Sequence, residues 1–257
     1  MTRTTATPPQ VPTPVDMLDP TTASRTPTRS LRTPALVAGV GLLVLAVLAA
    51  WANFGVVEAL VTETDPATTA RDILASETMF RLGIVALLLV AILDIVVAWA
   101  LGAFFAPVHG GVSAVAAWLR AVYGGVFMIA IIQLASALNV LEDIGTSTAF
   151  TADQLQAEAL GRVESFYLMW DASLLLFGLH LILLGYLAYR STYAPRILGA
   201  LLVIAGLGYL VDSFGALLAP GSLPGIAVFT FMGEALLLVW LLAKGRTTSI
   251  DDVAATS

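Results

Sequence analysis

Six runs of apolar residues, each about 20 residues long or longer, constrain this chain more than any other feature of its sequence. They cover residues 34–54, 80–105, 112–141, 163–189, 197–218 and 225–243. Each run is long enough to cross the roughly 30 Å of hydrocarbon in a bilayer once. Because hydrocarbon offers no hydrogen-bond partners, the runs must form helices or a closed barrel, and continuous apolarity without alternation selects helices. The sequence therefore predicts an all-α polytopic membrane protein, a bundle of six transmembrane helices in a lipid bilayer.

The overall composition agrees with a bilayer environment. The 257 residues are 58% hydrophobic and only 12% charged, whereas an ordinary soluble domain is about 25% charged. The absence of Cys excludes disulfides, a thiol nucleophile and cysteine-ligated metal sites. The net charge is −6 and the basic residues are scattered, which argues against nucleic acid as a partner.

The first part of the chain has a different composition from the rest. Residues 1–31 are rich in Thr and Pro and nearly free of large apolar side chains, so they cannot bury enough surface to offset the entropy of ordering. We expect a disordered cytoplasmic arm over residues 1–31, a six-helix transmembrane domain over 32–245 and a short cytoplasmic tail over 246–257. The arm is either a plain solvated tail or a tether or phosphorylation target.

The basic residues predict the orientation in the membrane. With both termini in the cytoplasm, eight of the twelve basic residues fall in cytoplasmic segments, as the positive-inside rule requires. These eight are Arg3, Arg25, Arg29, Arg32, Arg190, Arg196, Lys244 and Arg246. Most acidic residues lie in the loops on the opposite side.

The loops carry signals of their own. Asp65 followed by Pro66, and the capping box between Thr151 and Gln154, predict helical outer loops that run on into the second and fourth spans. The turns on the cytoplasmic side are short, which predicts hairpins of span two with three and of span four with five. Gly199 and Gly206 lie a heptad apart and predict close helix packing.

Six ionisable side chains fall well inside the apolar runs, although each costs about 2.5 to 3.5 kcal/mol on insertion scales. Counting about 1.5 Å per residue from the ends of the runs assigns them to two depths. A candidate charge cluster in the cytoplasmic half consists of Asp94, Arg120 and His180. A candidate polar pocket in the outer half consists of Asp171, Asp212 and Glu234, with Arg81 at the outer rim.

We predict that Asp94 and Arg120 form a charge pair close to His180. We also predict that the outer pocket opens to the outside and exchanges protons, because like charges in a low dielectric cannot all ionise. The structural alternative is that the buried Asp and Arg only neutralise each other, that His180 donates to a backbone carbonyl, and that a lone carboxyl stays protonated.

Known enzyme signatures are missing from the sequence. The chain has two His and no H-E-x-x-H, G-x-S-x-G, Walker A or dinucleotide-binding motif, so we expect neither a metal nor a cofactor, and an enzyme is the less favoured class. The leading hypothesis is a carrier whose buried carboxylates bind a small cation, a proton or a small solute. The alternative is a non-catalytic membrane scaffold or sensor, with an intramembrane hydrolase a distant third. A carrier needs a polar cavity, whereas a scaffold has tightly packed helices and paired charges.

Several stretches resemble a known family of membrane proteins. They are residues 177–186 (FGLHLILLGY), 193–199 (YAPRILG), 205–213 (AGLGYLVDS) and 77–83 (ETMFRLG), with Gly233 and Glu234 in the last run. These stretches resemble the family called domain of unknown function 4386, over roughly residues 32–245. The resemblance implies a multi-pass protein of the bacterial cytoplasmic (inner) membrane. It implies no activity and no catalytic residues.

Overall fold

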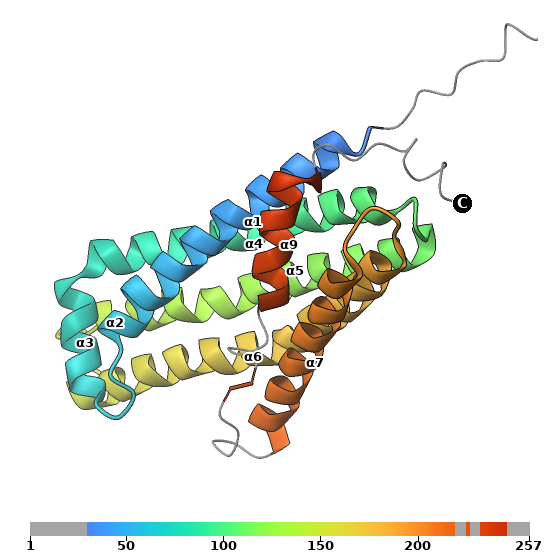
Figure 1. Ribbon diagram of the computed structural model, residues 1–257. Coiled ribbons are helices and arrows are strands. Elements are labelled where there is room, and N and C mark those ends of the chain that lie inside the picture. Colours follow the sequence, from blue (N-terminus) through green and yellow to red (C-terminus); the bar gives the residue numbers. More distant parts are fainter. Residues whose placement is uncertain (1–29, 219–224, 227–231, 246–257) are drawn as a thin grey trace, which may run out of the picture.

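The computed structural model describes residues 30–218, 225–226 and 232–245 of the chain. Within these residues the chain forms helices joined by turns, with no strand (Figure 1). The elements are α1 (Arg32–Ala52), the π-helical η3 (Asn53–Val57), α2 (Glu58–Leu60), α3 (Pro66–Ala75), α4 (Glu77–Phe105), α5 (Gly110–Glu142), α6 (Ala152–Arg190), α7 (Arg196–Leu218) and α9 (Met232–Ala243). The prediction of an all-α polytopic protein is confirmed.

Five helical segments are long and apolar enough to cross a membrane. They are Arg32–Leu60, Glu77–Phe105, Gly110–Glu142, Ala152–Arg190 and Arg196–Ala216. The sixth predicted run, residues 225–243, is described as helix only over the 12 residues of α9. Residues 227–231 of that run, and residues 1–29 of the predicted arm, lie outside the described residues.

Both long loops that were predicted to be helical contain helix, but only one of the two helices continues into the following span. The α6 helix begins at the capping box of Thr151 and Gln154 and continues without interruption to Arg190. In contrast, α3 does not run on into α4. Ser76 adopts φ −122° and ψ 31°, and its N–H donates to the carbonyls of Asp72 and Ile73, which closes α3 before α4 begins. The two helices therefore point in different directions (Figure 1).

Each long helix packs against at least two others, and so does α9. The α6 helix contacts α5 and α7 most extensively, α4 packs against both α1 and α5, and α9 rests against α1 and α7. The close approach of α6 and α7 depends on glycine. A Cβ at Gly206 would lie 2.5 Å from the carbonyl oxygen of Gly178, and one at Gly199 would lie 2.7 Å from that of Gly185. Both predicted hairpins, α4 with α5 and α6 with α7, are present.

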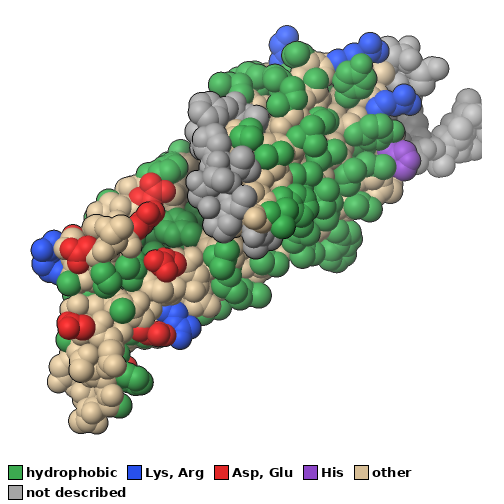
Figure 2. Space-filling model, turned by 90° about the horizontal axis from the view of Figure 1, so that it is seen from below, with side chains coloured by type: hydrophobic (Ala, Val, Ile, Leu, Met, Phe, Trp, Pro, Cys, Tyr) green, Lys and Arg blue, Asp and Glu red, His purple; other side chains and the backbone are tan. Residues whose placement is uncertain are grey.

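Charged and apolar side chains are segregated along the molecule. Figure 2 shows acidic side chains gathered at one end together with some basic ones, further basic side chains and a histidine at the other end, and hydrophobic side chains between the two ends. The apolar surface includes large exposed side chains such as Val47, Trp99, Trp118 and Ile132. A surface of this kind suits contact with lipid rather than with water.

Candidate functional site

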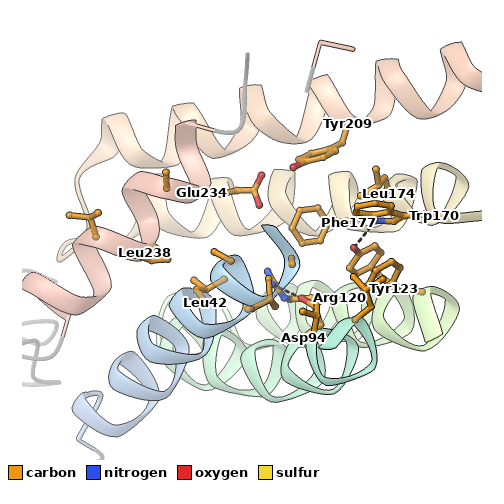
Figure 3. Close-up of a pocket in the computed structure, with 18 residues that line it drawn as sticks. Leu42, Asp94, Arg120, Tyr123, Trp170, Leu174, Phe177, Tyr209, Glu234 and Leu238 are labelled. Carbon is orange, nitrogen blue, oxygen red and sulfur yellow. Dashed lines mark hydrogen bonds and ion pairs between the residues drawn. The ribbon is translucent and has the colours of Figure 1, made fainter. Parts of the chain in front are cut away.

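A cavity of about 450 Å³ lies between the helices of the bundle and is partly open to the surface, where the lining residue Val239 is 58% exposed. Its wall is built by α1, α4, α5, α6, α7 and α9, so every long helical element contributes to it. Among the described residues, three of the lining side chains are acids or bases, namely Asp94, Arg120 and Glu234 (Figure 3). The remaining lining is aromatic and aliphatic. The cavity has the size of a small-molecule site, for which about 300 to 1,000 Å³ is usual.

Asp94 on α4 and Arg120 on α5 form an ion pair, as expected from their equal depth. Arg120 Nη2 lies 2.5 Å from Asp94 Oδ1, and each side chain is only 3% exposed. Gly124 lies one turn beyond Arg120 and allows this approach, because a Cβ there would lie 3.1 Å from the Ala91 carbonyl oxygen and 3.4 Å from Asp94 Cβ. The local sequence thus brings α4 and α5 close enough for the two charges to meet.

The ion pair does not use all of its hydrogen-bonding capacity. Asp94 Oδ1 is contacted by Arg120 Nη2, but Arg120 Nε has no hydrogen-bond partner among the described residues. The guanidinium carbon of Arg120 lies 5.1 Å from the centre of the Phe177 ring, a cation–π contact. Arg120 is therefore held between a carboxylate and an aromatic ring at the wall of the cavity.

Glu234 reaches the cavity from the first turn of α9. The preceding residue, Gly233, is pressed against α7, since a Cβ there would lie 2.7 Å from the carbonyl oxygen of Leu201. This contact holds the described first turn of α9 against α7. Figure 3 shows the Glu234 carboxyl pointing into the cavity beside the Tyr209 hydroxyl. Glu234 Oε1 is buried without a hydrogen-bond partner among the described residues. One oxygen of a carboxyl group that lines the cavity is thus buried without compensation.

Aromatic side chains form a continuous part of the wall. They are Tyr123, Phe127, Trp170, Phe177 and Tyr209. Phe177 lies 5.0 Å from the ring of Tyr123 and 5.3 Å from that of Tyr209, and Trp170 Nε1 donates to the Tyr123 hydroxyl at 3.3 Å. We did not predict this wall from the sequence. Its signal is the spacing of 120, 123 and 127 on α5 and of 170, 174 and 177 on α6, which places each set on one helix face.

The structure does not bring the four residues of the predicted outer pocket together. Arg81 lies at the acidic end, half exposed, and forms ion pairs with Glu77 and Glu142. Of the four, Glu234 alone lines the cavity, where it faces the Asp94–Arg120 pair instead of Arg81.

The other two acids of that predicted pocket meet where α6 and α7 pack together. The Ser213 hydroxyl donates to the backbone carbonyl of Asp171 at 2.9 Å. The neighbouring Asp212 accepts a hydrogen bond from the backbone N–H of Ile226 at 2.8 Å. Asp171 and Asp212 are therefore close to each other but separate from the cavity lining.

His180 lies near the ion pair but is bonded to the backbone. Its side chain is fully buried, and Nδ1 donates to the carbonyl of Ala116 at 2.8 Å, one turn before Arg120 on α5. Its ring packs 5.9 Å from that of Phe177. This is the backbone contact that the structural alternative expects for His180. Across the described residues, no cluster of three His, Cys, Asp or Glu side chains could hold a metal ion.

Comparison with known proteins places this architecture in a family. A family model described as domain of unknown function (DUF4386) matches residues 37–245. An uncharacterized protein from the archaeon Archaeoglobus fulgidus is 35% identical over 166 residues, which cover 65% of this chain and 85% of that protein. No solved structure is significantly similar to the chain. Because the match covers most of the 257 residues, the chain belongs to the DUF4386 family of proteins.

Proposed function

We propose that this protein is a membrane carrier that binds a small solute in the central cavity and exchanges a proton at Glu234. The observation that supports this most directly is the buried, unpartnered Oε1 of Glu234, whose side chain lines a cavity of about 450 Å³. A buried polar atom without a partner is costly, so its place is best explained by a group that enters the cavity.

The alternative function, a scaffold or sensor, fits only part of the site. A scaffold needs close helix packing and paired charges, and the Asp94–Arg120 pair meets that requirement. The cavity and the unpaired oxygen of Glu234 have no role in a scaffold. A carrier uses both features, because the pair neutralises itself and leaves Glu234 as the lining acid whose charge can change when a proton or a solute binds.

The proposed location is the cytoplasmic membrane of a bacterial cell, with both termini in the cytoplasm. The gathering of acidic side chains at one end, and the presence of Arg32, Arg190, Arg196 and Lys244 at the other, support this orientation. The archaeal relative indicates that similar chains are not restricted to bacteria. The proposed division of the chain is an arm over residues 1–31, the transmembrane domain over 32–245 and a tail over 246–257.

Infrared difference spectroscopy between pH 5 and pH 8 tests proton exchange in the detergent-solubilised protein. We expect a carboxyl band that disappears in Glu234→Gln and persists in Asp212→Asn, whose carboxyl lies outside the cavity lining. If no carboxyl titrates in this range, or if Glu234→Gln leaves the band unchanged, the scaffold becomes the better description.

A further inference from the structure

We propose that the solute is an organic monocation, a hydrophobic amine or quaternary ammonium ion whose charged nitrogen binds beside Glu234. This inference rests on the proposed function, because it assigns a ligand class to the same cavity. Three independent properties of the cavity support it: its charge, its aromatic wall and its apolar remainder.

The charge of the cavity favours a single positive charge on the ligand. The ionisable groups that line it are two acids and one base, together with the hydroxyls of Tyr123 and Tyr209. The 2.5 Å contact between Asp94 and Arg120 cancels one acid against the base. When Glu234 is ionised, the lining therefore has one uncompensated negative charge, and a monocation neutralises it. An anion would add a second negative charge in a low dielectric, which is unfavourable.

The aromatic wall already binds a cation from the protein itself. The guanidinium of Arg120 lies 5.1 Å from the centre of the Phe177 ring, within the range of a cation–π contact. Tyr209 packs edge-to-face on Phe177 at 5.3 Å and stands beside the Glu234 carboxyl (Figure 3). A carboxylate next to such rings is the combination by which proteins recognise ammonium groups.

The rest of the lining does not suit a strongly hydrated divalent cation. It consists of aliphatic side chains, among them Leu42, Leu87, Leu174 and Leu238. A strongly hydrated ion such as Mg²⁺ or Ca²⁺ needs several oxygen ligands, which this wall does not offer among the described residues. A ligand with an apolar body and one charged end satisfies both parts of the cavity.

The exchange that follows from this assignment is electrically balanced. When the protonated Glu234 binds a permanently charged cation, the carboxyl O–H bond breaks, the proton leaves to solvent and the carboxylate stays as the counter-ion. One positive charge enters for each proton that departs. Protonation of Glu234 from the other side then releases the cation, which is the cycle of a cation–proton antiporter.

Calorimetry on the full chain in lipid nanodiscs tests the ligand class with a matched pair of probes. Benzyltrimethylammonium carries the charge, and neopentylbenzene is its uncharged counterpart of nearly the same shape. With empty nanodiscs as the blank, we expect the parent to bind the cation and to bind the neutral probe more weakly by about tenfold or more. Titration in two buffers of different ionisation enthalpy should show that protons are released on binding.

Two variants complete the test. Glu234→Gln should weaken binding of the cation by about tenfold or more and abolish proton release, while Asp212→Asn should leave both unchanged. Equal binding of the two probes by the parent, a comparison that needs no variant to fold, would overturn the cation assignment but leave the cavity as a solute site. Binding of neither probe, together with no titrating carboxyl in the infrared spectrum, would overturn the proposed function as well.

Discussion

Asp94 and Arg120 form a buried pair of opposite charges. Without its partner, each charge would be left uncompensated in an apolar environment. Both side chains are 3% exposed, and removing one partner of a buried pair typically costs about 3 to 5 kcal/mol because the other is left uncompensated. We therefore expect Asp94→Asn and Arg120→Gln each to lower the free energy of unfolding by about that amount, and the double variant to lose less than the sum. Thermal unfolding in detergent measures this, and additive losses would show that the two residues do not interact.

Asp65 provides a residue-scale prediction outside the membrane. Its carboxyl accepts hydrogen bonds from the Thr68 hydroxyl at 2.7 Å and from the Thr68 N–H at 3.0 Å, which lower the pKa of Asp65 below its ordinary value of 3.8. A lowered folded-state pKa means that the stabilisation is complete above the ordinary value and is lost as the pH falls through the folded-state value.

We expect Asp65→Ala to speed hydrogen exchange in the first turn of α3 at pH 7, because the variant lacks the helix cap. After correction for the intrinsic pH dependence of exchange, the difference between parent and variant should shrink as the pH falls below about 4. Hydrogen–deuterium exchange with mass spectrometry follows both. A difference that persists unchanged at low pH would mean that the carboxylate is not the group responsible.

At the scale of elements, the close contact of α6 with α7 depends on glycine residues, which have no side chain to separate the helices. A Cβ at Gly206 would meet the carbonyl oxygen of Gly178 at 2.5 Å and the backbone nitrogen of Ile182 at 3.0 Å, so the two helices would have to separate. We expect Gly206→Ala to lower the free energy of unfolding by about 1 to 3 kcal/mol, as overpacking does.

Gly125 offers a matched control for this substitution. A Cβ at Gly125 on α5 meets nothing within 4 Å, and alanine is favoured over glycine inside a helix by about 1 kcal/mol. Gly125→Ala should therefore be neutral or stabilising when both variants are unfolded thermally in the same detergent. Similar behaviour of the two variants would contradict the close backbone contact.

The sequence predicted elements better than it predicted the rotation of helices about their axes. Apolar length identifies the helices because hydrocarbon leaves the backbone no other partners, and counting along straight helices puts Asp94 and Arg120 at one depth. Depth alone does not say which face of a helix points inward, so the aromatic wall was missed. Glu234 was grouped with Asp171 and Asp212, whereas the structure places it in the lining of the cavity that also contains Arg120.

At the scale of the whole molecule, the separation of charge predicts the orientation. The basic end holds Arg32 at the start of α1, Arg190 at the end of α6, Arg196 at the start of α7, and Lys244 after α9. We expect a fluorescent reporter fused after Ser257 to be active, and a phosphatase that requires the periplasm to be inactive at that position. The same phosphatase inserted within residues 145–149 should be active. Phosphatase activity at the C-terminus would contradict the proposed orientation.

The position of the ion pair on consecutive helices has a consequence for biogenesis. During synthesis α4 leaves the ribosome before α5, so Asp94 reaches the translocon while Arg120 is still inside the ribosomal exit tunnel. The short connection of residues 106–109 lets the second helix follow almost at once, and the hairpin then enters the lipid with its charges neutralised. We therefore expect α4 to remain at the lateral gate of the translocon until α5 has emerged, and the two helices to enter the lipid together as one unit.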